Sequence, residues 1–278
     1  MKKISLILLA VLFTVVTTAQ KKEKLKGSKI VTIEQKEVES FEAIEVQGDL
    51  EISLVKGDKP GVEIEADDNL HQALGISMNG NIMILSMANE ISGAKKFSIR
   101  VTYNDSFKSV VAKNNSKVNA LEEVKLDEIS FTAFDNAKLS LNINSKALTL
   151  ALNDKAKAEF NAKTESCSIE LSKSAEIKAL ISSTEMKCDL YQKSKAVIEG
   201  DVIDMKLRID NNATFNGSKL TAKNIALIAE NYSNCSVSAE TSLIVEASGN
   251  TEIQLYGEPK IDMKQFTGSA TLYKKVTK

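Results

Sequence analysis

The stretch LIVEASGNTEIQLYGEPK, residues 243–260, places two short apolar runs on either side of a polar corner, Ser248-Gly249-Asn250. Apolar and polar residues alternate within the runs, as at Ile253 and Leu255, and a period of two is typical of β-strands. The same order of apolar run, polar corner, small residue and second apolar run recurs along the chain. This stretch is therefore one unit of a repeat, and a repeat of this kind predicts a scaffold rather than a particular chemistry.

Nine segments from Phe107 onward follow the pattern, and their last apolar residues are about 19 residues apart on average. They are NSKV (115–118), NAKL (136–139), KAKA (155–158), SAEI (174–177), SKAV (194–197), NATF (212–215), NCSV (234–237), NTEI (250–253) and SATL (269–272). Units this short leave no space for a helix and cannot bury their apolar faces alone, so they must stack on one another.

The second position of each segment is expected to lie at a tight corner that faces inward, where only a small side chain fits. Eight of its nine residues are small, and Lys195 is the exception, so we predict a local bulge there; the column is Ser116, Ala137, Ala156, Ala175, Lys195, Ala213, Cys235, Thr251 and Ala270. The polar residue before it is often asparagine, which can stack along the rod and exchange amide hydrogen bonds, or can reflect ordinary turn composition; these residues are Asn115, Asn136, Asn212, Asn234 and Asn250.

We therefore predict an all-β protein, a right-handed parallel β-helix (β-solenoid) of about nine coils over residues 107–278, with stacked strands about 4.8 Å apart. Residues 30–106 are expected to form an N-terminal antiparallel β-hairpin cap region, because Asn79-Gly80 lies between alternating apolar residues. A second pair of strands is expected around residues 56–61. Residues 30–278 would then be one continuous domain.

The first nineteen residues have the order of a secretory signal peptide: two lysines, an apolar core from Ile4 to Val16, and small residues ending at Ala19. Cleavage is predicted between Ala19 and Gln20, and the lysine-rich residues 20–29 are predicted to be disordered. The alternative, a membrane anchor, is disfavoured because the apolar run is too short, and no later run reaches the ~20 residues of a membrane helix. We expect export to the periplasm, the outer cell surface or the exterior, and no transmembrane segment in the mature chain.

Removal of Lys2 and Lys3 changes the formal net charge from −1 to −3. A near-neutral chain with interspersed charges provides no basic field for nucleic acid. The single histidine, His71, is expected in a turn, and the sequence offers neither zinc ligands nor a nucleophile beside it. We predict no catalytic, cofactor-binding or metal-binding residues, and no cofactor.

Three cysteines cannot all pair within one chain. Cys167 and Cys188 are 21 residues apart, close to one coil, so a disulfide between adjacent coils is possible if a β-bulge aligns them. Three buried thiols are the alternative. Cys235 is expected to be a buried thiol at the small corner position.

Two stretches carry a resemblance to a known family. FEAIEVQGDLEISLVKGDKPGVEIEADDNL (41–70) resembles the opening of the "putative autotransporter adhesin, head GIN domain" family, with its xVxIxAxxNL ending. LIVEASGNTEIQLYGEPKIDMKQFTGSATLYKK (243–275) resembles its end, with Ser/Thr-Gly-Ser/Asn corners and a YGxP step. The resemblance covers nearly the whole chain after the leader, although NAKL, KAKA, SAEI and SKAV replace the usual Ser-Gly-Ser corners.

The resemblance implies a secreted or envelope β-helical protein of Bacteroidetes-type bacteria, a domain of unknown function with no functional residue to carry over. We therefore expect a non-enzymatic secreted or cell-envelope solenoid, an adhesin-like binding or scaffold protein whose partner is a surface glycan or an envelope protein. A periplasmic accessory subunit that binds a partner protein is one alternative.

The other alternative is a polysaccharide-processing enzyme that uses a carboxylate pair, and the nearest acidic clusters are Asp67-Asp68, Asp201-Asp204 and Glu185-Asp189. Sugar binding would favour exposed aromatic faces, and Tyr256 with Tyr273 is the candidate platform, against the alternative that both are structural.

Overall fold

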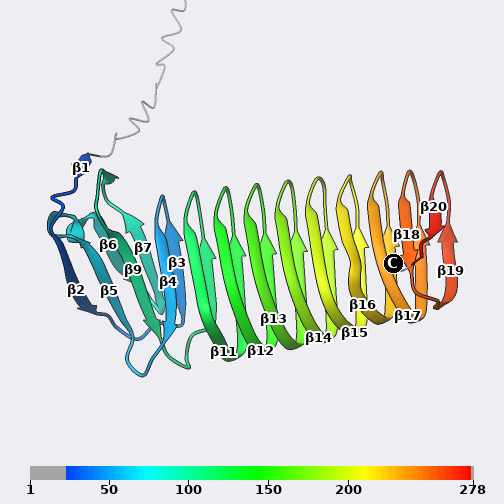
Figure 1. The fold of residues 1–278 in the computed structure, drawn as a ribbon, viewed down its shortest axis with the longest axis horizontal. Helices are drawn as coiled ribbons and strands as arrows, with labels where there is room; N and C mark the ends of the chain where they lie inside the picture. Colours follow the sequence, from blue (N-terminus) through cyan, green and yellow to red (C-terminus); the bar gives the residue numbers. More distant parts are fainter. Residues whose placement is uncertain (1–22, 277–278) are drawn as a thin grey trace, which may run out of the picture.

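The structure is a computed structural model that describes residues 23–276. The predicted leader and its cleavage site lie outside the described residues. The molecule is a long β-solenoid of about nine turns, with a cap at one end and the C-terminal strands at the other (Figure 1). The predicted solenoid fold is thereby confirmed.

The body of the rod consists of seven long strands that stack in parallel, each on the next. They are β11 (Lys117–Ala133), β12 (Lys138–Leu152), β13 (Lys157–Leu171), β14 (Glu176–Leu190), β15 (Lys195–Ile209), β16 (Thr214–Ala229) and β17 (Asn234–Ala247). Each bends near its middle. In β12 the buried positions change parity at the bend, from Ser145 to Leu148, because the two halves face each other across the core.

The halves therefore form two opposed sheets. The first sheet contains the N-terminal halves (residues 138–145 of β12, for example) and ends in β18 (Glu252–Tyr256) and β20 (Thr271–Lys274). The second sheet contains the C-terminal halves (residues 147–152 of β12) and ends in β19 (Lys260–Phe266). Alternate residues of both sheets point inward and are buried, which explains the period of two seen in the sequence.

The tight corner that joins successive coils has a fixed backbone conformation. Positive φ recurs at each corner, and the first such residues form a column: Gly48, Asn114, Asp135, Asp154, Lys173, Gln192, Asn211, Asn231, Gly249 and Gly268. At two corners the next residue, Asn212 or Tyr232, also has positive φ. Glycine, asparagine and aspartate tolerate this conformation best. At most of the corners where an asparagine was predicted, the first residue with positive φ lies one residue before that asparagine. Asn115 and Asn136 do bond along the rod, Nδ2 of Asn136 donating to Oδ1 of Asn115 at 3.2 Å.

A buried small residue follows each corner from Asn114 to Gly249, as expected, but two of the predicted members are wrong. The column contains Ser194 and Ser233, both fully buried, in place of Lys195 and Cys235. Lys195 is the exposed first residue of β15 and pairs in register with Glu176, so the bulge predicted there is absent. The register shift of β15 lies between Val197 and Glu199. Cys235 is buried at a strand position and stacks on Phe215.

The solenoid begins earlier than the predicted boundary at residue 107. β3 (Ala43–Gln47) and β4 (Glu51–Lys56) pair in parallel with β10 (Ser109–Ala112) and β11, so they already form the first coil. Residues 57–106 leave this coil, build the cap and return. The boundary was missed because β3 and β4 meet their partners only after a separation of some sixty residues in sequence.

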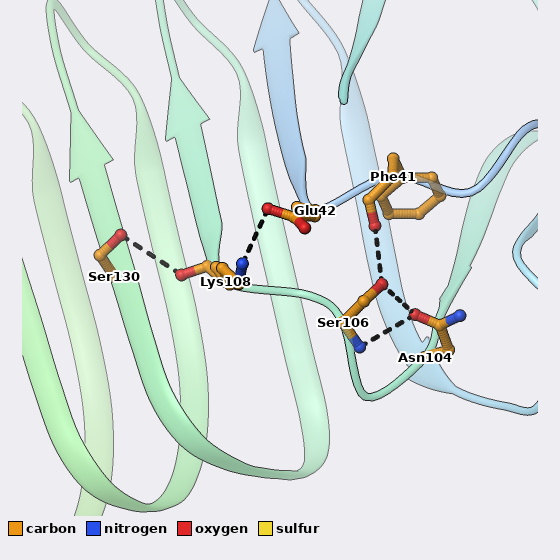
Figure 2. Close-up of polar contacts among 6 residues, drawn as sticks. All are labelled: Phe41, Glu42, Asn104, Ser106, Lys108 and Ser130. Carbon is orange, nitrogen blue, oxygen red and sulfur yellow. Dashed lines mark hydrogen bonds and ion pairs between the residues drawn. The ribbon is translucent and has the colours of Figure 1, made fainter. Parts of the chain in front are cut away.

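Polar contacts and aromatic packing fix the point of return (Figure 2). Ser106 Oγ donates to the carbonyl oxygen of Phe41 at 3.3 Å, and Lys108 Nζ lies 2.8 Å from Oε2 of Glu42. Beneath them, the ring of Phe107 packs edge-on against Phe41 with centroids 6.0 Å apart. Contacts between residues 41–42 and residues 106–108, which are far apart in sequence, thus close the first coil.

The cap extends both sheets beyond the first coil. β9 (Phe97–Tyr103), β5 (Gly61–Asp67) and β2 (Val31–Glu37) continue the first sheet, and β7 (Ile82–Met87) and β6 (Leu74–Asn79) continue the second. β6 and β7 are antiparallel around the Gly80 turn. The two strands expected around residues 56–61 are present as β4 and β5, but they do not pair with each other, because β9 lies between them. The helical turn η1 (Asp68–Ala73) buries Leu70 and Ala73 over the core.

The segment predicted to be disordered is ordered where it is described. β1 (Lys24–Lys26) pairs in parallel with β8 (Glu90–Ser92). The buried carboxylate of Asp67 then holds the chain, accepting hydrogen bonds from the backbone N–H groups of Lys29, Lys95 and Lys96 at 2.9 to 3.1 Å. Asn69 Nδ2 donates to the carbonyl oxygen of Lys26 at 2.8 Å. The family-like ADDNL stretch therefore fastens the start of the fold.

Candidate functional site

The outer face of the second sheet is hollowed along the rod. A hollow of about 540 Å³ crosses five consecutive coils, β13 to β17, and is lined by Ser166, Cys167, Ser168, Glu185, Met186, Lys187, Asp204, Met205, Lys206, Asn224, Ile225, Ala226, Ser242 and Ile244. At a strand spacing of ~4.8 Å, five coils span roughly 19 Å. We call this surface the groove.

The outward side chains that line the groove differ in length from coil to coil. On β13 the outward residues at this level are Ser166 and Ser168, and Ala226 of β16 and Ser242 of β17 are also small. The charged side chains of β14 and β15 project from the coils between these small residues. The floor is strand backbone, with the inward side chains beneath it.

The groove brings like charges together. Register pairs Glu185 of β14 with Asp204 of β15, and two residues further on it pairs Lys187 with Lys206. Among the described residues, neither Glu185 nor Asp204 has a cation within ion-pair distance, and Lys206 has no carboxylate partner. Two carboxylates and one ammonium group are therefore free to meet a ligand.

Neighbouring groups hold some of these side chains in position. Asn224 Nδ2 donates to Oδ1 of Asp204 at 2.8 Å, and Ser242 Oγ donates to Oδ1 of Asn224 at 2.8 Å. Lys187 is engaged on the other side, with Nζ 2.7 Å from Oδ2 of Asp189. The hydrogen bond to Asp189 raises the pKa of Lys187 above its ordinary value, so this lysine stays charged.

Two further hollows lie on this surface. On coils shared with the groove (β14 to β17), but nearer the C-terminal ends of these strands, a hollow of about 350 Å³ has apolar outward residues, Ile228 and Ile244, beside Tyr191 and Arg208. Towards the cap, a hollow of about 460 Å³ is lined by Lys108, Ser130 and Thr149 near the junction in Figure 2. The second sheet thus offers a polar track with an apolar border.

The predicted tyrosine platform lies away from this track, on the first sheet. Tyr256 and Tyr273 both point outward from neighbouring coils, but Tyr273 is in register with Gln254, two residues from Tyr256. Tyr273 is 48 % exposed and carries the ammonium group of Lys275 at 5.7 Å from its ring centroid. The two rings do not stack in register, and their use as a platform stays a prediction.

The three cysteines are buried free thiols. Cys167 is in register with Met186, and Cys188 is in register with Ile169, so the two cysteines are two residues out of step on adjacent coils. No bulge brings them together, and the possible disulfide between Cys167 and Cys188 is not formed in this structure. Burial raises the pKa of Cys167 and of Cys235 to about 12.

The structure distributes the three predicted acidic clusters differently. Asp67 is the buried clasp of the cap. Asp201 belongs to the first sheet, where it accepts a hydrogen bond from Ser182, whereas Asp204 belongs to the second. The pair that meets across coils, Glu185 with Asp204, was missed in the sequence. The signal was present, because these acids are separated by one repeat length.

His71 is buried in η1, not in an open turn. Its Nε2 lies 2.7 Å from Oγ1 of Thr32 and its Nδ1 lies 3.5 Å from Oε2 of Glu34. A hydroxyl group therefore does lie beside the histidine, contrary to expectation. Neither residue lines the hollows described above, and the contacts join β2 to η1, which closes the end of the core.

Within residues 23–276, no group of three or more histidine, cysteine or acidic side chains is placed to hold a metal ion. The same residues contain no helix with the length and apolar character needed to cross a membrane.

Comparison with known proteins gives a consistent assignment of the fold. A "putative adhesin" from Parabacteroides merdae ATCC 43184 is 16 % identical, with a TM-score of 0.64, and the match covers 91 % of this chain and 99 % of that one. A "putative adhesin" from Parabacteroides distasonis ATCC 8503 has the same identity and coverage and a TM-score of 0.63. A "putative lipid binding protein" from the same organism is also 16 % identical, with a TM-score of 0.62 over 91 % of this chain and 100 % of that one.

A comparison with curated proteins finds no match. The family described as "Putative auto-transporter adhesin, head GIN domain" matches residues 40–181 and 150–259, which together include the first coil, the groove and the cap apart from β1 and β2. The chain belongs to this family.

Proposed function

We propose that this protein is a non-enzymatic solenoid of the cell envelope or exterior that binds a surface glycan along the groove. The observation that carries the proposal is the in-register pairing of Glu185 with Asp204 and of Lys187 with Lys206 on a hollowed face. Like charges directly opposite each other destabilise paired strands. Their presence is expected where a ligand, rather than stability, determines the side chains.

The first sheet provides the contrast. There, Lys157 pairs with Glu176 at 2.8 Å and Lys219 pairs with Glu199 at 3.1 Å across adjacent coils. The first sheet also has a run of like charges, Lys117, Lys138 and Lys157, but both ends of the run are neutralised, by Glu51 and by Glu176. The acids of the groove have no such partner among the described residues.

The shape and chemistry of the groove favour an elongated polar polymer. A shallow track of roughly 19 Å suits several linked units better than one enclosed small molecule. Carboxylates accept hydrogen bonds from ligand hydroxyl groups, and the ammonium group of Lys206 donates to ligand oxygens. The exposed Ile244 at the border can contact the apolar face of a sugar ring.

Two alternatives use the same surface. Glycoside hydrolysis requires one carboxyl group on each side of the glycosidic bond. In the groove, Glu185 and Asp204 are the two carboxyl groups that lie close enough together to take these roles. A periplasmic accessory subunit would instead place an envelope protein on the groove. The leader-like residues 1–19 and the family's adhesin description support an exported protein in either compartment.

The chain from Gln20 onward, incubated with polysaccharide released from bacterial outer-membrane preparations, tests these possibilities together. We expect retention of the protein on the immobilised polysaccharide, with no new reducing ends in solution. New reducing ends that disappear with Glu185→Gln would establish the enzyme instead. Absence of retention, together with cross-linking to an envelope protein on cells, would support the accessory subunit and overturn glycan binding.

Protease treatment of intact producing cells, with an internal periplasmic marker, tests the location. Cleavage of the protein without loss of the marker places the groove outside the cell, where a surface glycan is accessible. Protection until the outer membrane is opened places it in the periplasm.

A further inference from the structure

The C-terminal end of the rod leaves core positions uncovered. Ile261, Met263 and Phe266 of β19 occupy the register positions of the buried Leu243, Val245 and Ala247, one coil earlier. They are nevertheless 40 %, 49 % and 37 % exposed, because no further coil lies over them among the described residues. β19 and β20 also present their outer edges without a backbone partner in the same part of the chain.

The opposite end is built differently. Its core is closed by η1, yet its outermost strands, β2 and β6, each pair on one edge only, with β5 and β7 respectively, within residues 23–276. Ile30, which directly precedes β2, and Ile33 within β2 are 62 % and 64 % exposed. Unpaired strand edges with exposed apolar residues are templates for pairing with another chain.

The strand directions at the two ends are compatible. β2 is antiparallel to β5, β5 is antiparallel to β9, and β9 is parallel to β4. β2 therefore runs in the same direction as the solenoid strands of the first sheet. A second copy placed in line would continue the first sheet by parallel pairing of β20 with β2, and the second sheet by antiparallel pairing of β19 with β6.

The C-terminal end and the β2 edge that would face it carry opposite net charge. The C-terminal end, residues 258–275, carries four lysines against two acids, and β2 with its following loop, residues 31–39, carries three glutamates against one lysine. Contact between unlike ends brings positive to negative, whereas contact between two C-terminal ends brings positive to positive. Charge arrangements of this kind select the partner and its orientation.

We propose that a second copy of this chain docks head-to-tail, the open C-terminal end of one rod resting on the β2 and β6 edges of the next. This contact is heterologous, so it extends the rod and repeats the groove along it. An extended array would present many equivalent grooves to a polymeric ligand and would increase the strength of attachment.

The test uses the chain from Gln20 onward, which contains every described residue, and two variants that each block one end. Ile33→Lys places a positive charge at the N-terminal edge, and Met263→Glu places a negative charge at the C-terminal end. Both positions are exposed, so the fold should persist, and circular dichroism confirms it. Lys264→Glu is the second C-terminal variant if Met263→Glu does not fold.

Sedimentation velocity at low salt measures assembly. We expect the unmodified chain to form species larger than a monomer as concentration rises, with each variant alone monomeric at concentrations where the unmodified chain is more than half assembled. An equimolar mixture of the two variants should form a dimer, because each supplies the open end that the other lacks.

Three results would overturn the proposal. They are an unmodified chain that stays monomeric up to millimolar concentration, Ile33→Lys protein that still dimerises alone through its C-terminal ends, and a mixture that contains only monomers.

Discussion

Glu185 of β14 lies directly beside Asp204 of β15, one coil further along, on the outer face of the second sheet. Register fixes this neighbourhood, because both strands continue in phase from the corner at Ser194 to the end of β15. The two carboxylates lie in the groove without a cation partner among the described residues, and Asp204 alone accepts a side-chain hydrogen bond, from Asn224. A ligand that donates hydrogen bonds would relieve the remaining repulsion between the two carboxylates.

This relationship predicts that removing one charge stabilises the free protein. Glu185→Gln should raise the free energy of unfolding by about 0.5 kcal/mol, since like charges directly opposite each other cost a few tenths to ~1 kcal/mol. Urea unfolding measures the change. Glu176→Gln, which breaks the ion pair with Lys157 on the first sheet, should leave stability unchanged or slightly lower. A less stable Glu185→Gln protein would contradict the repulsion.

The buried serine hydroxyl groups at the corners predict opposite changes in stability for two opposite substitutions. The Oγ of Ser194 is buried without a hydrogen-bond partner in the described structure, one coil from the fully buried Ala175. An unsatisfied buried hydroxyl group costs ~1–3 kcal/mol. Ser194→Ala should therefore stabilise the protein by about 1 kcal/mol, and Ala175→Ser should destabilise it by a similar amount. Equal destabilisation by both would mean that Ser194 has a partner.

We expect the three buried cysteines to be unreactive towards thiol reagents in the folded protein. Burial holds the pKa of Cys167 and of Cys235 at about 12 and that of Cys188 well above its usual range, so thiolate is scarce at neutral pH. A maleimide reagent at pH 8 should label none of them in the folded protein and all three after denaturation. Labelling of a single cysteine after denaturation, with a mass lower by two hydrogens, would establish the Cys167–Cys188 disulfide.

Asp67 predicts how stability responds to acid. Burial raises the pKa of this carboxyl group. Hydrogen bonds from the backbone N–H groups of Lys95, Lys29 and Lys96 lower it by more than burial raises it, so the pKa lies below the ordinary value. A depressed pKa contributes stability above the unfolded pKa of about 4, and this contribution is lost as the pH falls through the folded pKa.

Asp67→Asn should accordingly be less stable than the unmodified chain at pH 7, with a smaller loss of stability between pH 5 and the acid transition. Chemical unfolding at a series of pH values measures both effects. Asp58→Asn, in an exposed loop, is the control and should follow the unmodified chain. Parallel pH profiles for the Asp67→Asn protein and the unmodified chain would exclude a role of this carboxylate in acid sensitivity.

The fold could be predicted because each coil repeats the same two requirements, a small buried residue after the corner and alternating apolar residues in the strands. Errors arose where the four-residue pattern placed the small buried residue too late. Ser194 directly precedes Lys195, and Ser233 lies two residues before Cys235, so the pattern missed the buried residue at those two coils. The strands β4 and β5 were predicted, but their separation in the sheet was not, because β9, a strand some thirty residues later, inserts between them.

The candidate site was less predictable. The repeat length alone places Glu185 beside Asp204, so this pair could have been found by applying the coil spacing to the acidic residues. The hollow could not have been predicted in this way, because it depends on the sizes of the outward side chains that several coils place next to one another. The aromatic criterion pointed to the first sheet, whereas the groove contains polar and aliphatic side chains.

A titration of two matched double variants tests whether the groove binds a glycan. Glu185→Gln with Asp204→Asn removes the unpaired acids of the groove, and Glu159→Gln with Asp201→Asn removes two exposed acids of the first sheet. Hydrogen bonds to charged groups contribute ~1.5–3 kcal/mol each. Affinity for the envelope polysaccharide should fall at least tenfold in the groove variant and stay within twofold in the control. Equal affinity of both variants would show that the ligand binds elsewhere.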